Sequence, residues 1–185
     1  MRWALLLALL LGPRSNAHEL QENRATLVLR DKSHIAITLY IAYSDALHRA
    51  LLPQRPFGSF LAIYSAMKPE DLQKELLRAQ AKFEASIHMY LSPGPGRQIA
   101  IRSWIWPDAK QVQSMLQQRM MAAMVDPGGH AHDQPLEIHA DAVAPVDVGG
   151  LTIRFPEEFE KVLVVSYRPN QVWVEKKTLS REIKF

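Results

Sequence analysis

Apolar and polar residues alternate along residues 34–43, which is the pattern of a β-strand with one buried face. The residues of one face are all large and apolar: Ile35, Ile37, Leu39, Ile41 and Tyr43. A second β-rich segment, residues 24–30, precedes this strand across the turn Asp31-Lys32-Ser33. The two segments predict a tight antiparallel hairpin.

Further along the chain the apolar period lengthens to three or four residues, which indicates helices. The most regular apolar series is Leu72, Leu76, Ala79, Phe83, Ile87 and Tyr90. It predicts one amphipathic helix of about six turns that begins at Pro69 and ends before 92–96. Shorter helices are expected at 45–52 with Ser44 as N-cap, at 57–67, and at 108–125 with Asp108 as cap. In the last of these, Met120 and Met124 are expected to face the core.

Strand patterns return in the second half of the chain. They are expected at 97–106, 136–143, 151–155, 162–167 and 172–175, the last paired with 179–185. Because strands cluster at both ends with helices between them, the fold class is α+β. We expect an antiparallel sheet or sandwich, immunoglobulin-like in size, in which the first hairpin pairs with C-terminal strands across a helical insertion at 44–91.

The first 17 residues have the features of a secretory signal peptide. Arg2 precedes nine apolar residues, and Ser15 and Ala17 supply the small residues that signal peptidase requires. Since a spanning helix needs about 20 apolar residues, cleavage after Ala17 is favoured over a permanent anchor. The sequence therefore predicts a periplasmic protein with one mature domain, 18–185, that does not itself span the membrane.

Composition narrows the classes of function. The 185 residues carry a formal net charge of +3, which falls to +1 once the two arginines of residues 1–17 are removed. That balance, without basic runs, argues against nucleic acid as a partner. The chain has no cysteine, so disulfides, thiol chemistry and cysteine-held metals are excluded.

Histidines give the clearest chemical candidate. His130, His132 and Asp133 follow Gly128-Gly129, and His139 lies seven residues beyond His132. Imidazoles of this set, with Asp133 or Glu137 as an oxygen ligand, suit copper, zinc or nickel. The alternative is a solvated polar loop followed by a polar strand face.

Two further features are compatible with copper. Cleavage after Ala17 would make His18 the first residue, whose amine and imidazole form a chelate. Met120, Met121 and Met124 are spaced so that pairs of thioethers share a helix face, although methionine more often fills a core.

Signs of catalysis are weak. Asp45 and His48 share a helix face, but no nucleophile motif accompanies them, and Glu157-Glu158 is expected to be a solvated turn. Trp104 and Trp106 share a strand face, and the long helix is expected to pack against their rings. The sequence thus favours a protein that is not an enzyme.

Two stretches carry a resemblance: HELQENRATLVLRDKSHIAITLYIAYS at 18–44 and FPEEFEKVLVVSYRPNQVWV at 155–174. In them the chain is similar to exported bacterial proteins whose function is uncharacterised. The resemblance implies a β-rich periplasmic domain and assigns no site residue.

Two hypotheses for the function are favoured, with a hydrolase that no motif reveals as a third. One is a non-enzymatic binding or accessory protein that handles a transition metal through His130, His132 and His139. The other is a structural domain that docks an envelope or inner-membrane protein through a sheet edge or the turn 167–170, with the histidines incidental.

Overall fold

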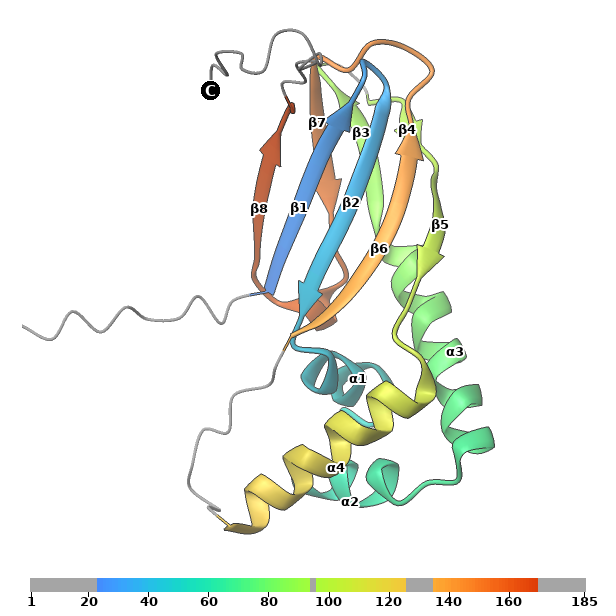
Figure 1. Ribbon diagram of the computed structural model, residues 1–185, viewed down its shortest axis with the longest axis vertical. Coiled ribbons are helices and arrows are strands. Elements are labelled where there is room, and N and C mark those ends of the chain that lie inside the picture. Colours follow the sequence, from blue (N-terminus) through green and yellow to red (C-terminus); the bar gives the residue numbers. More distant parts are fainter. Residues whose placement is uncertain (1–22, 94–95, 126–134, 170–185) are drawn as a thin grey trace, which may run out of the picture.

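A computed structural model describes residues 23–93, 96–125 and 135–169 (Figure 1). Within them, a five-stranded sheet has the order β5-β6-β2-β1-β8 and a three-stranded sheet has the order β4-β3-β7. The strands of the first sheet are β1 (Asn23–Arg30), β2 (His34–Ile41), β5 (Ile101–Ile105), β6 (Leu136–Val143) and β8 (Val162–Tyr167). Those of the second are β3 (His88–Ser92), β4 (Gln98–Ile99) and β7 (Gly150–Arg154).

The helices gather at one end of the two sheets (Figure 1). They are α1 (Tyr43–Leu51), α2 (Phe57–Ser65), α3 (Pro69–Ser86) and α4 (Ala109–Val125), with a short 3₁₀ turn, η2 (Glu157–Phe159). The α+β class is confirmed. No helix in the described ranges has the length and apolar character needed to cross a bilayer. The predicted signal peptide and the strands expected at 172–185 lie outside the described residues.

The predicted hairpin and its pairing across the helices are both confirmed. β1 and β2 pair antiparallel from Arg24↔Tyr40 to Arg30↔His34 around a turn in which Asp31 has a φ of 51°. β2 pairs antiparallel with β6, and β1 pairs with β8. The β1–β8 pair is parallel, because the chain crosses the helical end before it returns as β8.

The inner face of the hairpin forms the centre of the core. The apolar residues of β2 that alternation placed on one face are at most 1% exposed. Met89 of β3 and Ile99 of β4 belong to the same buried cluster, so both sheets contribute to one core. In Figure 1 the three-stranded sheet lies behind the five-stranded one.

Two predicted boundaries of helices are wrong. α3 starts at Pro69 as expected but ends at Ser86, and residues 88–92 form β3 instead of a last helical turn. The apolar period misled because Ile87 and Tyr90 continue its spacing, although Ile87 is the residue that ends α3 and Tyr90 lies in β3. Ser44 does not cap α1: it lies inside the helix, fully buried, and accepts a hydrogen bond from Arg119 of α4 (2.7 Å). Asp108, in contrast, caps α4 through a reciprocal pair of hydrogen bonds with Gln111 (2.8 and 3.0 Å).

The strand expected at 97–106 is divided between the sheets. β4 belongs to the smaller sheet and β5 to the larger one, with the change at Ala100. A register shift between Arg102 and Ile105, with Ser103 at a φ of 55°, turns Ile105 outward and brings Trp104 and Trp106 against the core. Simple alternation assigned the isoleucines of this strand to one apolar face and could not show the bulge.

Phe83 of α3 joins the helices to the ends of the strands. Its ring centroid lies 5.0 Å from that of Phe159, 6.0 Å from Trp106 and 6.5 Å from Tyr43. The indole Nε1 of Trp106 also donates to Glu84 (2.7 Å). The expectation that the long helix packs against the tryptophans is therefore confirmed for Trp106.

Glu158 anchors the η2 turn and is not solvated as the sequence suggested. Its carboxylate is 15% exposed and forms an ion pair with Lys82 of α3 (2.6 Å). Arg49 of α1 donates to the Glu158 carbonyl oxygen (2.8 Å) and pairs with Glu160 (2.6 Å). Partial burial acts to raise the pKa of Glu158, but the hydrogen bond and charge of Lys82 outweigh it and hold that pKa below 4.5.

We expect Phe83→Ala to reduce the free energy of unfolding by about 3–5 kcal/mol, because a large cavity replaces a fully buried ring. Leu77→Ala on the exposed side of α3 is the matched control and should cost no more than about 0.5 kcal/mol. Urea denaturation measures both. Equal losses in the two variants would contradict the central position of Phe83.

The Lys82–Glu158 pair predicts a contribution to stability that depends on pH. Since the folded-state pKa of Glu158 is lowered, this contribution is present above pH 4.5 and is lost as the pH falls through the folded-state pKa. The difference in unfolding free energy between the wild type and Glu158→Gln should be constant from about pH 6 to 8 and shrink in acid. Denaturation at several pH values checks it, and the same trend in the control Glu157→Gln would rule out the ion pair as the cause.

Candidate functional site

The polar strand face predicted for the metal site is present on β6. Glu137, His139 and Asp141 lie on its outer face, and Ile138 and Ala140 are buried on the other. His139 Nε2 lies 3.4 Å from Glu137 Oε1, and its Nδ1 lies 3.5 Å from the Thr38 hydroxyl. Both side chains of the His139–Glu137 pair are about half exposed.

The other predicted ligands lie outside the described residues: His18, His130, His132 and Asp133. Within the described part of the chain, no three histidine or carboxylate side chains converge in a manner that could hold a metal ion. The remaining polar groups near His139 have partners across the strands. Tyr40 donates to Glu137 (3.2 Å), and His34 lies 3.0 Å from Asp141.

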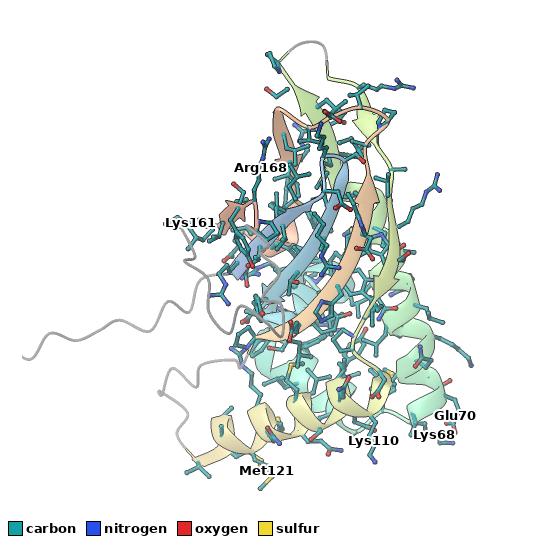
Figure 2. The ribbon with its side chains drawn as sticks, turned by 45° about the horizontal axis from the view of Figure 1, so that its top comes forward. Lys68, Glu70, Lys110, Met121, Lys161 and Arg168 are labelled. Carbon is teal, nitrogen blue, oxygen red and sulfur yellow. The ribbon has the colours of Figure 1, made fainter. Side chains whose placement is uncertain are left out.

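The methionines of α4 differ from the expectation. Met115 is buried and Met120 is partly buried, but Met124 is 70% exposed, so its predicted inward orientation is wrong. Met121 is 68% exposed and extends from α4 away from the body of the molecule (Figure 2). The apolar stripe of α4 ends early because α2 and α3 cover only its first turns with buried residues.

The groups considered for acid–base chemistry have structural partners. Asp45 pairs with Arg119 (3.0 Å), and His48 Nε2 contacts the carbonyl oxygen of Arg55 (2.7 Å). Burial raises the pKa of Tyr43 and of Tyr64. None of these side chains lines the cavity described next.

A cavity of about 310 Å³ opens between the two sheets, beside β8. Leu27, Leu29 and Ile35 of the hairpin line one side of it. The other lining residues come from the segment that includes β7 and from β8 and its end: Val148, Gly149, Gly150, Leu151, Ile153, Val164, Ser166, Tyr167 and Arg168. The volume is within the range of ligand pockets, and most of the lining side chains are apolar.

β8 forms the rim of this cavity and the edge of the larger sheet. Its register with β1 places Val164 and Ser166 on the cavity side and Leu163 and Val165 on the outer side, and Tyr167 at the end of the strand also lines the cavity. The apolar side chains of both sides are between 39% and 52% exposed. In the described residues β1 is the one strand that pairs with β8, so its second edge has free backbone groups.

Cations lie at the two ends of β8. Lys161 and Arg168 are both on this side of the molecule, whereas Lys110 lies on α4 at the helical end (Figure 2). Arg168 donates to the carbonyl oxygen of Val148 (2.6 Å), which fixes the end of β8 against the loop before β7. The same loop is tied to the hairpin turn, because Val148 N donates to the Lys32 carbonyl oxygen (2.8 Å).

Sequence reasoning placed this strand correctly but missed the cavity. The one available signal was the run of Val162 to Val165, which is apolar without alternation. Such a run is typical of a strand covered on both faces, yet here the structure leaves both faces accessible. The cavity itself depends on which strands of the two sheets face each other, and no local pattern records that.

No protein-family model, no curated protein and no solved structure matches the chain. The resemblance to exported bacterial proteins therefore stays a prediction. The cavity and the edge of β8 are therefore the features that bear on the function of the chain.

Proposed function

We propose that the chain is an exported, non-enzymatic binding or accessory protein whose two sheets pack as a sandwich and dock an envelope protein along β8. The observation that carries the proposal is the accessible edge of β8, with Leu163, Val164 and Val165 about 40% exposed on its two faces. Monomeric proteins normally protect such an edge with charges, bulges or a covering element.

The cavity supports the same proposal. An extended segment that adds to β8 gains backbone hydrogen bonds along the strand, and alternate side chains of that segment reach the cavity. Because Leu27, Leu29 and Ile153 line the cavity, an apolar side chain is the favoured occupant. The partner in this proposal presents an extended segment with apolar residues at every second position.

The contrast with the other edge of the sheet favours β8 as the docking strand. β5 contains the register shift and the positive φ of Ser103, features that discourage pairing with another strand. β8 pairs with β1 over six successive residues without such an interruption.

We expect a photoactivatable benzoylphenylalanine at Leu163 to give covalent adducts with an envelope protein in cells that produce the chain. The same amino acid at Lys110, which is also exposed but lies on α4, is the matched control and should give none. Electrophoresis after irradiation detects the adducts. Adducts at Lys110 alone, or at neither position, would contradict docking at β8.

Metal handling is a second candidate, favoured by the His139–Glu137 pair. This pair lies on an accessible strand face that directly follows the segment containing His130 and His132. An imidazole and a carboxylate 3.4 Å apart are ligands that copper, zinc and nickel accept. In this proposal His130 and His132 complete the site, and His18 is a ligand only if cleavage follows Ala17.

We expect protein purified without an affinity tag to carry nearly one equivalent of copper, zinc or nickel if the second candidate is right. The metal should be lost in the double variant His130→Ala/His132→Ala and retained in His34→Ala, a histidine of the same sheet face with its own partner, Asp141. Elemental analysis measures the content. Protein that is free of metal and does not bind added copper, zinc or nickel would exclude the site.

A further inference from the structure

The cavity between the two sheets has one polar end. Ser166 and Tyr167 end β8, Arg168 follows them, and all three residues line the cavity. Arg168 donates a hydrogen bond to the carbonyl oxygen of Val148 (2.6 Å), which lies in the loop before β7. The end of β8 and the start of β7 are accordingly at the same end of the molecule (Figure 1). The polar groups of the lining are therefore gathered where these two strands meet.

The opposite end of the cavity is apolar. Val164 lies one step further into the sheet on the cavity side of β8, where its partner on β1 is the buried Ala25. Leu27 of β1 and Ile153 of β7 line the cavity from its other sides. Among the described lining residues Arg168 alone carries a charge. An occupant with a charged group at one end and an aliphatic body matches this division.

Arg168 has the properties needed to bind an anion at the polar end. Its side chain is exposed, and the hydrogen bond to Val148 leaves other N–H groups of the guanidinium fork available. The neighbouring acidic residue of the loop, Asp147, is paired with Lys32 (3.5 Å). Because guanidinium groups bind carboxylates with two parallel hydrogen bonds, a carboxylate is the favoured charged group.

The volume of the cavity limits the length of the aliphatic body. A cavity of about 150 Å³ lined by apolar side chains holds one benzene molecule. The cavity beside β8 has about twice that volume, about 310 Å³, and so has room for about 12 non-hydrogen atoms. An unbranched carboxylate of about ten carbon atoms, such as decanoate, has this size. A whole phospholipid is far larger.

We propose that the cavity binds an unbranched aliphatic carboxylate of about ten carbon atoms, the size set by the cavity volume. Its carboxylate lies on Arg168, and its chain extends between the sheets toward Val164 and Ile153. The inference goes beyond the proposed function, because the described lining forms this site without a partner. The carboxylate and an apolar side chain of a docking segment compete for the same space.

Titration calorimetry of the full purified chain with hexanoate, octanoate, decanoate and dodecanoate, below the concentrations at which micelles form, tests the size of the site. We expect the affinity to rise about fourfold with each methylene up to decanoate, since each one leaves water for an apolar wall. Dodecanoate should bind less than about twofold more tightly than decanoate, because the cavity is then full. No binding of decanoate, or an equal gain per methylene up to dodecanoate, overturns the proposal.

Two neighbouring valines of β8 provide matched variants for the location of the site. Val164 and Val165 are 41% and 40% exposed but lie on opposite faces of the strand. We expect Val164→Phe to fill the cavity and weaken decanoate binding at least about tenfold, and Val165→Phe to change it less than about twofold. Equal affinities in the two variants overturn the cavity as the site. Circular dichroism checks that both fold, and Ser166→Leu, on the same side as Val164, replaces a variant that does not.

Arg168→Gln tests the charged end of the site. We expect it to weaken decanoate binding at least about tenfold and to leave the binding of uncharged decanol within about twofold, since decanol makes no ion pair. Lys161→Gln, at the other end of β8, is the matched control and should leave decanoate binding unchanged. Equal losses in Arg168→Gln and Lys161→Gln, or decanol that binds wild type as tightly as decanoate, overturn the assignment of the carboxylate to Arg168.

The ligand site and docking at β8 fail in distinguishable ways. Calorimetry uses the chain without a partner, whereas adducts at Leu163 report the partner alone. Decanoate binding without adducts removes docking and leaves the ligand site, and adducts without decanoate binding remove the ligand site and leave docking. Binding to phosphatidylglycerol vesicles in place of decanoate overturns the ligand site in favour of a lipid surface.

Discussion

The structure depends on covering one apolar face of the β1–β2 hairpin. Along β2 every second residue is essentially inaccessible to solvent, so a layer of other residues must lie against the whole length of that face. The layer consists of three strands at one end and helices at the other (Figure 1). The cavity that Leu27 and Ile153 share lies between the two sheets, beside the edge strand β8.

At the helical end, aromatic rings pack together in the core, and ion pairs hold the η2 turn against α1 and α3. The ring of Phe83 lies among residues of α1, of η2 and of the chain just after β5. One side chain therefore connects three parts of the chain that are far apart in sequence. Lys82 and Arg49 add charged contacts to the same η2 turn through Glu158 and Glu160. The consequence is that β8 starts from a firmly held turn, while its far edge remains accessible. Rigidity at the start of a strand together with an open edge is favourable for adding another strand.

Much of the fold could be predicted from the sequence, because the strongest elements have periodic burial. The alternation from Ile35 to Ile41 predicts β2, and the spacing from Leu72 to Phe83 predicts most of α3. The predictions failed where the same pattern of residues is compatible with two different structures. Ile87 and Tyr90 extend the helical period, yet Ile87 ends α3 and Tyr90 lies in β3. Ser44 resembles a cap but is a buried partner of Arg119. Of the candidate site, His139 and Glu137 could be predicted to share a face, but the cavity beside β8 could not, since its lining residues come from strands of both sheets that are far apart in the sequence.

The composition of β8 is best understood from what surrounds it. A strand that was always at an open edge would be expected to carry charges or a bulge, and Val162 to Val165 has neither. A strand that was permanently central would be expected to have neighbours on both sides, and the described residues supply β1 alone. The sequence of β8 is suited to an edge along which a partner segment docks, as proposed above. Its exposed valines and the adjoining cavity both agree with such an edge.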